Sequence, residues 1–232
     1  PETHDLSSLQ YDRPGATALE RHLAEWEAYL EWVVGEKRSP LLDECAFAVV
    51  DVETTGMQPV GDDRITEIAV VVVQGARREV VFDSLVNPGR SIPGRIQELT
   101  GITDAMVQGA PAFRDIADQV VDALAGRVFV AHNARFDWGF VGAEVKRARD
   151  LALDGPRLCT VRLARRLYRH EPSYSLGSLA ARFGMEFTAR HRAAGDALVD
   201  DAGAELAGHH LPRRCKLALG RGHTGHAGRD AG

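Results

Sequence analysis

The chain has 232 residues, of which 44% are hydrophobic, so it can bury the core of one ordinary domain plus an appendage, or of two small domains. The formal net charge is −5, but residues 1–139 are strongly acidic, whereas residues 140–232 are net basic and rich in arginine. This asymmetry suits a metal-bearing site beside a track for a polyanion, and solvated surface charge explains it equally well.

The composition excludes several other classes of protein. The three cysteines, Cys45, Cys159 and Cys215, are far apart, so we expect neither a cysteine zinc site nor a disulfide framework. No apolar run approaches the roughly 20 residues that span a bilayer, and no basic-then-apolar leader opens the sequence. We therefore expect a soluble, cytoplasmic protein that does not contact a membrane.

The first part of the chain predicts one amphipathic helix. Residues 1–15 are polar, and residues 16–35 carry an apolar stripe at helical spacing, formed by Leu19, Leu23, Trp26, Leu30 and Val33. This extra N-terminal helix either packs on the main domain or docks a partner. We assign residues 1–42 to this arm and helix, residues 43–208 to the main domain, and residues 209–232 to a flexible tail rich in Gly, His and Arg.

Three apolar runs predict the start of a sheet, at Ala46–Val50, Ile65–Val73 and Glu79–Val86. The third run alternates, with Val80, Phe82 and Leu85 on its expected buried side. Because short glycine-containing links join the runs, we expect antiparallel pairing here.

Shorter strands and helices alternate through the rest of the domain. We predict helices at Arg95–Leu99, Phe113–Leu124, Ala134–Arg149, Val161–Tyr168, Leu176–Phe183 and Ala193–Ala207, and strands at Val128–Ala131 and Arg157–Thr160. Three successive strands followed by this alternation predict an α/β domain with a mixed five-stranded sheet flanked by helices.

Two acids follow the first predicted strand. Asp51 and Glu53 are two positions apart, and such side chains share one face of a strand, so both carboxylates can reach one metal cluster. Thr54, Thr55 and Gly56 come next, and the glycine lets the backbone turn sharply and lets a ligand approach the main chain. An Asp-x-Glu pair alone is common on surfaces. The apolar run before it favours a site, because a buried strand does not readily end in two acids without a positive partner.

A second polar group, His-Asn-Ala-Arg-Phe-Asp at residues 132–137, lies between a predicted strand and a predicted helix. Asp137 falls in the first turn of this helix and faces back toward the strand end. Its interaction with the helix dipole is an alternative explanation for an acid at this position. Phe136 fits a core position better than a platform on which a base stacks.

A third group begins at His191 and ends at Asp196, where a predicted loop opens the last helix. Asp196 is placed to complete a set of carboxylates. His191 is placed to act as a general base, because its ordinary pKa of about 6.5 suits proton transfer at neutral pH. A lone histidine is more often structural or exposed, so the small residues between His191 and Asp196, which leave room for a substrate, support the interpretation.

Together these groups resemble the three exonuclease motifs of the DEDDh 3′–5′ exonucleases. The matching segments are Phe-Ala-Val-Val-Asp-Val-Glu-Thr-Thr-Gly, His-Asn-Ala-Arg-Phe-Asp and His-x-Ala-x-x-Asp. The resemblance covers about residues 45–208 and extends to the proofreading epsilon subunits of bacterial replicative DNA polymerases, through Asn-Pro-Gly-Arg-Ser-Ile-Pro and Leu-Thr-Gly-Ile-Thr-Asp-Ala-Met-Val. One departure is Thr100, where relatives often carry histidine.

The resemblance implies an RNase H-like exonuclease fold and a metal-dependent 3′–5′ exonuclease that acts on single-stranded DNA 3′ ends in proofreading or repair. It also implies that two Mg²⁺ or Mn²⁺ ions are bound by Asp51, Glu53, Asp137 and Asp196, with His191 as the base. The residues implied to contact substrate are Thr54, Thr55, Gly56, His132, Asn133 and Phe136.

Arginines supply candidate phosphate contacts. Arg190 and Arg192 lie beside His191, and a predicted helix region carries Arg162, Arg165, Arg166 and Arg169. Solvated helix surface is the alternative explanation for most of this second group.

Two other functions stay open. One is an RNA-trimming or oligoribonuclease-type exonuclease, because relatives act on both DNA and RNA. The other is a non-catalytic nucleic-acid-binding accessory module of a polymerase, which predicts the loss of a motif residue, whereas all the motif residues are present. For the leading function as for these two, the N-terminal helix and the C-terminal tail are the candidate binding sites for a polymerase or repair partner.

Overall fold

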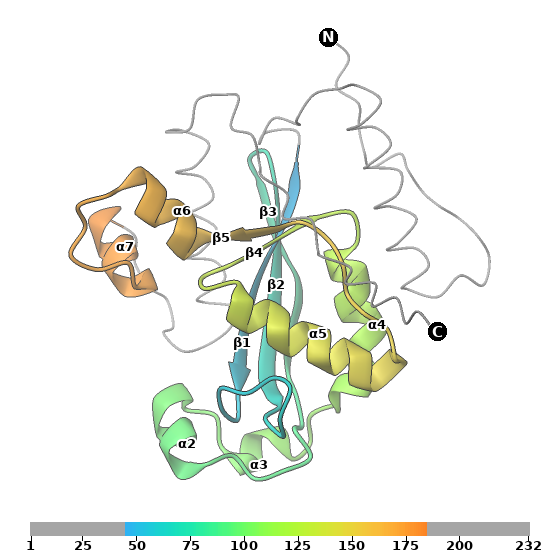
Figure 1. Ribbon diagram of the computed structural model, residues 1–232. Helices are drawn as coiled ribbons and strands as arrows, with labels where there is room; N and C mark the ends of the chain where they lie inside the picture. Colours follow the sequence, from blue (N-terminus) through green and yellow to red (C-terminus); the bar gives the residue numbers. More distant parts are fainter. Residues whose placement is uncertain (1–44, 185–232) are drawn as a thin grey trace, which may run out of the picture.

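The computed structural model of the chain describes residues 45–184, and these form a sheet flanked by helices (Figure 1). The predicted helices at residues 16–35 and 193–207, the tail at 209–232 and the proposed domain boundaries all lie outside the described residues. Among residues 45–184, no helix is both long and apolar enough to cross a bilayer.

The sheet is mixed and has five strands in the order β3-β2-β1-β4-β5. β1 (Ala46–Thr54) is central. On one side it pairs antiparallel with β2 (Ile65–Gln74), which pairs antiparallel with β3 (Arg77–Leu85). On the other side it pairs parallel with β4 (Val128–Ala131), which pairs parallel with β5 (Arg157–Cys159). The predicted mixed five-stranded sheet and its antiparallel start are therefore confirmed. β1 continues past the predicted end at Val50 because its pairing with β2 extends to Thr54.

Side chains of the central strand alternate between two cores. Ala48, Val50 and Val52 belong to the larger core, which also contains apolar residues of α4 (Phe113–Leu124) and α5 (Arg135–Arg149). Phe47 and Val49 belong to a smaller core with residues of β2 and β4. By the twofold alternation of a strand, Asp51 and Glu53 continue this second row, on the face opposite α4 and α5.

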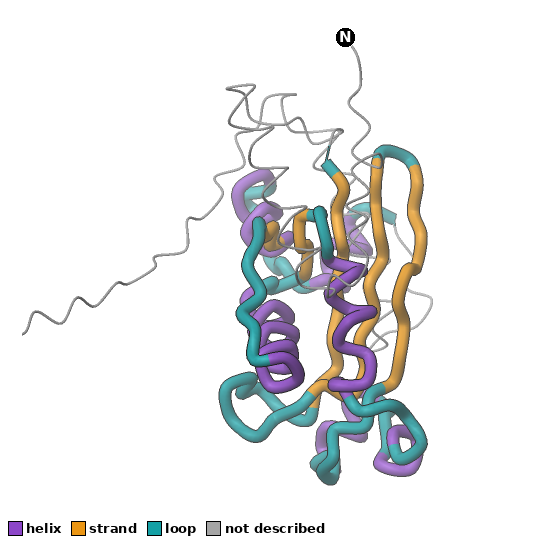
Figure 2. Tube along the Cα trace, turned by 90° about the vertical axis from the view of Figure 1, so that its right-hand side faces the viewer, coloured by secondary structure: helices purple, strands orange, loops and turns teal. Residues whose placement is uncertain are grey.

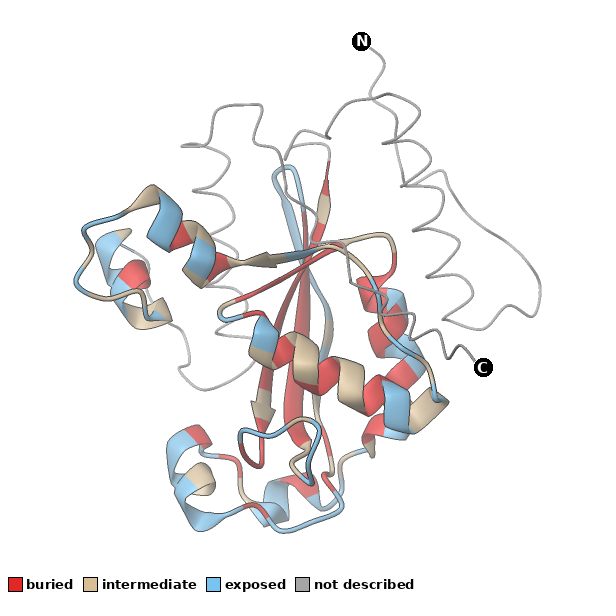
Figure 3. Cartoon of the chain, viewed as in Figure 1, coloured by how far each residue is buried: buried red, intermediate tan, exposed pale blue. Residues whose placement is uncertain are grey.

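The two long helices pack against each other and against the sheet. Figure 1 shows α5 crossing one face of the sheet beside α4, and Figure 3 shows buried residues along the middle strands and on these two helices. The predicted apolar stripe of α4 is confirmed, since Phe113, Ile116, Val120 and Leu124 are all buried. On α5, the fully buried apolar residues are Phe140, Val141 and Val145.

Four short helices complete the described part: α2 (Gly94–Thr100), α3 (Asp104–Val107), α6 (Thr160–Leu167) and α7 (Leu176–Arg182). α2 and α3 lie beyond the end of the sheet at which β1 finishes (Figures 1 and 2). α3, which the sequence pattern did not predict, is one turn long and is capped by Thr103, whose hydroxyl accepts a hydrogen bond from the Met106 N–H.

The predicted buried face of β3 is partly wrong. Phe82 and Leu85 are half-buried, but Val80 is 46% exposed and Val81 is 39% exposed. The reason is that β3 is an edge strand with an irregular register opposite Val70 and Val71, so its alternation does not correspond to one buried and one exposed face.

Candidate active site

The first motif lies at the carboxyl end of the central strand. Asp51 and Glu53 are half-buried in β1 and point to one face, as the two-residue spacing predicts. Antiparallel pairing places Asp51 opposite Ala69 and Glu53 opposite Glu67 of β2. The strand therefore presents two carboxylates side by side where it ends.

Glu67 is an acid near this motif that the sequence interpretation missed. It is only 2% exposed and faces the same side of the sheet as Glu53, because directly opposed residues of antiparallel strands share a face. Its signal in the sequence is a charged residue inside the apolar run Ile65–Val73. It adds negative charge to the face that carries the first motif.

The connection from β1 to β2 is a loop closed by its own hydrogen bonds. The Thr55 N–H donates to the Arg64 carbonyl (2.9 Å), and the Arg64 N–H donates to the Thr55 hydroxyl (3.0 Å). The Thr54 hydroxyl donates to the Gly56 carbonyl (2.6 Å). Thr54, Thr55 and Gly56 are all buried, so this segment has a fixed backbone directly after the two acids.

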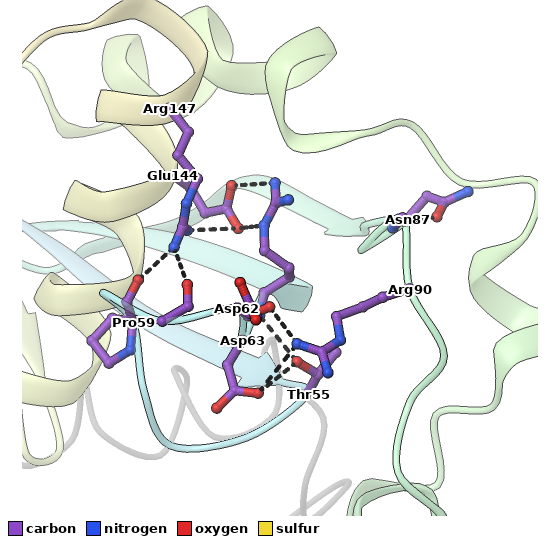
Figure 4. Close-up of polar contacts among 11 residues, drawn as sticks. Thr55, Pro59, Asp62, Asp63, Asn87, Arg90, Glu144 and Arg147 are labelled. Atoms are coloured by element: carbon purple, nitrogen blue, oxygen red, sulfur yellow. Dashed lines mark hydrogen bonds and ion pairs between the residues drawn. The ribbon is translucent and has the colours of Figure 1, made fainter.

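Gly56 is required by a close approach. A Cβ at Gly56 would lie 2.3 Å from the Asp63 carboxylate, which also accepts a hydrogen bond from the Gln58 N–H (3.0 Å) and one from the Thr55 hydroxyl (3.3 Å) (Figure 4). The chain bends sharply at residues 55–57, as expected at Gly56, and Gly56 does so without a positive φ. The group that approaches its backbone here is Asp63.

The second motif lies between β4 and α5. Asn133 is exposed and has a φ of 70°, a left-handed conformation that asparagine tolerates, and the chain enters α5 two residues later. Asp137 is 3% exposed in the first turn of α5, where the partial positive charge of the helix end stabilises a carboxylate. The predicted position of Asp137 is confirmed, and α5 packs against β1, the strand that carries Asp51 and Glu53.

His132 and Phe136 occupy different environments within this motif. The Nδ1 atom of His132 lies 3.0 Å from the hydroxyl of Thr160, the buried first residue of α6. Burial lowers the pKa of His132 below its ordinary value, and a hydrogen bond with the Tyr174 backbone opposes this effect. Phe136 is half-buried against the larger core, with its ring centroid 4.9 Å from that of Phe140, which agrees with the core position favoured by the sequence.

The remaining predicted site residues, Arg190, His191, Arg192 and Asp196, lie outside the described residues. Within residues 45–184, no group of three or more His, Cys, Asp or Glu side chains is close enough to hold a metal ion. The proposed metal set includes Asp196, so it is not contained in this part of the chain. The donors that are described fit a hard divalent cation, because Asp51 and Glu53 supply oxygen ligands from a partly accessible strand end.

The sequence matches the model of the RNase T exonuclease family over residues 48–200. This range contains Asp51, Glu53, Asp137, His191 and Asp196, the five residues that define the three motifs.

Two curated relatives have similar sequences. The 3′–5′ exonuclease DinG of Bacillus subtilis is 39% identical over 153 residues, which is 66% of this chain and 16% of that protein. The DNA polymerase III subunit epsilon of Aquifex aeolicus is 36% identical over 160 residues, which is 69% of this chain and 78% of that protein. The chain therefore spans a small part of the first relative and most of the second.

A solved structure has the same fold. Exonuclease X, in complex with 5′ overhanging duplex DNA, is 29% identical, with a TM-score of 0.56 over 69% of this chain and 88% of that one. The RNase H-like architecture expected from the motifs agrees with this similarity.

Proposed function

Because the chain belongs to the RNase T family of DEDDh 3′–5′ exonucleases, we propose that it removes nucleotides one at a time from single-stranded DNA 3′ ends. The observation that carries the proposal is the position of Asp51 and Glu53 at the end of the central strand, with Asp137 opening the helix that packs on that strand. DEDDh exonucleases typically use divalent metals.

In the proposed reaction, Asp51, Glu53, Asp137 and Asp196 hold two Mg²⁺ or Mn²⁺ ions through their carboxylate oxygens. When bound, such a pair of ions supplies an activated water and stabilises charge on the leaving oxygen. His191 accepts the proton of the attacking water, in keeping with the role of a general base.

The terminal nucleotide is proposed to lie against the backbone of Thr54–Gly56, beside His132, Asn133 and Phe136. In support, the first of these segments is held rigid by its own hydrogen bonds. Asn133 is exposed and Phe136 is only half-buried, so both have surface available for a ligand.

Phosphate contacts are proposed from arginines near the site. Arg162, Arg165 and Arg166 of α6 and the following Arg169 are all exposed. α6 begins at Thr160, which contacts His132 of the second motif, so this basic helix starts at the candidate site. We propose the same phosphate-binding role for Arg190 and Arg192, which flank His191 in the sequence.

An RNA-trimming exonuclease is the second candidate, because the same metal chemistry cleaves either backbone. The two are separated by the initial rates on 5′-labelled single-stranded DNA, mismatched duplex DNA and single-stranded RNA of one sequence. We expect a ladder that shortens from the 3′ end and a higher rate on single-stranded DNA than on RNA. A higher rate on RNA would favour the second candidate, and binding without metal-dependent turnover would favour a non-catalytic accessory module.

A polymerase or repair partner remains part of the proposal. We propose that it binds the predicted N-terminal helix or the C-terminal tail, and capture of the partner with and without residues 1–40 tests the first of these.

A further inference from the structure

Glu144 is a buried charge on α5 that the proposed reaction does not use. It is 1% exposed and lies on the helix next to the buried residue Val145. The Arg64 guanidinium binds it in a two-pronged arrangement, Nε to one carboxylate oxygen (2.5 Å) and Nη2 to the other (2.8 Å). These hydrogen bonds raise the pKa of Arg64, against the opposing effect of burial. The Arg64 guanidinium is therefore held in its charged form by Glu144.

Arg147 joins the same cluster to the loop after β1. Its Nη1 atom lies 3.5 Å from Glu144, and its Nη2 atom donates to the carbonyls of Pro59 (2.7 Å) and Gly61 (2.8 Å) (Figure 4). Arg64 reaches the other end of the loop, because its backbone exchanges two hydrogen bonds with Thr55. Arg147 therefore binds the middle of the loop to α5, and Arg64 binds the end of the loop to Glu144 of the same helix.

A third arginine holds the far side of the loop. Arg90 donates to the Asp62 carbonyl (2.6 Å), and its guanidinium lies 3.8 Å from the Asp63 carboxylate (Figure 4). Asp63 in turn lies against Gly56 and accepts a hydrogen bond from the Thr55 hydroxyl, two residues after Glu53. A rigid path therefore leads from α5 through the loop to the backbone after Glu53.

The position of Glu144 on its helix links this path to Asp137. Glu144 lies seven positions after Asp137, which is about two helical turns, so both point to the same side of α5. This ion pair, buried at Glu144 and one-third exposed at Arg64, contributes little net stability, because the desolvation of the charges offsets most of their attraction. What such a pair does provide is a fixed geometry, since an arginine fork fits a carboxylate in one arrangement.

We propose that Glu144, Arg64 and Arg147 form a positioning cluster, which fixes the spacing between Asp137 on α5 and the Thr54–Gly56 segment that follows Asp51 and Glu53. The cluster touches neither metal nor substrate and acts through the residues that do. This inference rests on the proposed exonuclease function, because it assigns the cluster a role in that site.

Arg147 and Arg149 provide a matched pair of variants. Both side chains are 32% exposed and both lie in the last turns of α5. Arg149 pairs with Asp118 (2.9 Å) and donates to the Arg114 carbonyl (3.1 Å), so it fastens α5 to α4 and not to the loop. Arg147→Ala and Arg149→Ala should therefore lower the melting temperature to a similar extent, while only the first releases the loop.

The test measures kcat and KM on 5′-labelled single-stranded DNA with Mn²⁺, together with amide hydrogen exchange of the metal-free protein. For Arg147→Ala we expect kcat to fall about tenfold with a smaller change in KM, since a displacement of about 1 Å costs up to 10²-fold in rate. We also expect faster exchange at the Gln58 and Gly61 N–H groups, which are hydrogen-bonded within the loop. Arg149→Ala should change neither quantity, and Arg147→Lys should recover part of the lost rate.

Equal effects of the two alanine variants on kcat, or a loop that exchanges faster in Arg147→Ala at unchanged kcat, would overturn the positioning role. A wild-type protein without metal-dependent exonuclease activity would instead overturn the proposed function, and with it the role of the cluster in that reaction. The exonuclease rate of the wild-type protein therefore shows whether the positioning role or the proposed function has failed.

Discussion

Glu53 of β1 and Glu67 of β2 lie directly opposite each other in antiparallel strands, and Glu67 is 2% exposed. Side chains in such a pair share one face, with Cβ atoms about 5 Å apart, and like charges there destabilise a sheet. A divalent cation near Glu53 would offset this repulsion. If metal binds at Glu53 as we propose, the stability of the sheet should therefore depend on metal.

Glu67→Gln tests that coupling. Removing one charge should stabilise the metal-free protein by about 0.5 kcal/mol and reduce the rise in melting temperature that Mn²⁺ produces, because less repulsion is left to relieve. Thermal unfolding with and without Mn²⁺ measures both effects. Glu79→Gln is the control, since Glu79 is exposed on β3 and pairs with Arg77 (2.6 Å). An unchanged response to Mn²⁺ in Glu67→Gln would contradict the coupling.

The lowered pKa of His132 predicts a loss of stability in acid. Unfolded histidine titrates at about pH 6.5, and folded His132 titrates below this value, so between the two the unfolded state binds more protons. His132 therefore has no effect on the pH dependence above about pH 6.5, and it destabilises the fold as the pH falls below that. Melting temperatures of the metal-free protein across this range should fall less steeply in His132→Gln than in the wild type. Parallel curves would show that His132 is not the group responsible.

The exposed arginines of α6 predict salt-sensitive binding of single-stranded DNA. Each phosphate contact contributes about −0.7 to the slope of log K against log salt for a single strand. Arg165→Ala combined with Arg166→Ala should make this slope shallower by about 1.4, if each side chain contacts one phosphate, and weaken binding equally for different sequences. Arg114→Ala, at an exposed position of α4, is the matched control and should leave the slope unchanged. Equal slopes for wild type and the double variant would limit phosphate contacts to other residues.

The proposed role of His191 predicts that its loss lowers kcat without weakening the binding of DNA or metal. His191→Ala should lower kcat by about 10²–10⁴-fold, the usual contribution of proton transfer. Binding of single-stranded DNA and of Mn²⁺, measured by titration under conditions without turnover, should stay close to that of the wild type. A parallel loss of DNA affinity and rate would show that His191 holds the substrate and is not the base.

Most of the described fold could be predicted from hydrophobic patterns, because β1, β2 and β4 and the long helices α4 and α5 each bury apolar side chains. α4 is the clearest case, since the prediction matches its observed bounds. The strand β3 could be predicted, but its buried face could not be, because its burial depends on its place at the sheet edge and on an irregular register. α3 is a single turn and is too short to show a periodic pattern.

Some residues of the candidate site could likewise be predicted from the sequence, and others could not. Asp51, Glu53 and Asp137 could be placed from the sequence because each lies next to a periodic element. Glu67 and Glu144 were missed, since the role of a charge inside an apolar stripe depends on the partner that the fold brings to it. For Glu144 that partner is Arg64, 80 positions away in the sequence.

The most direct test of the central claim is the product ladder from 5′-labelled single-stranded DNA with Mn²⁺, compared between Asp51→Asn and Asp62→Asn. Asp51 lies in β1 at the proposed metal site, whereas Asp62 is an exposed carboxylate of the neighbouring loop. Our account predicts that the wild type and Asp62→Asn shorten the DNA stepwise from its 3′ end and that Asp51→Asn does not. A full ladder from Asp51→Asn at the wild-type rate would contradict it.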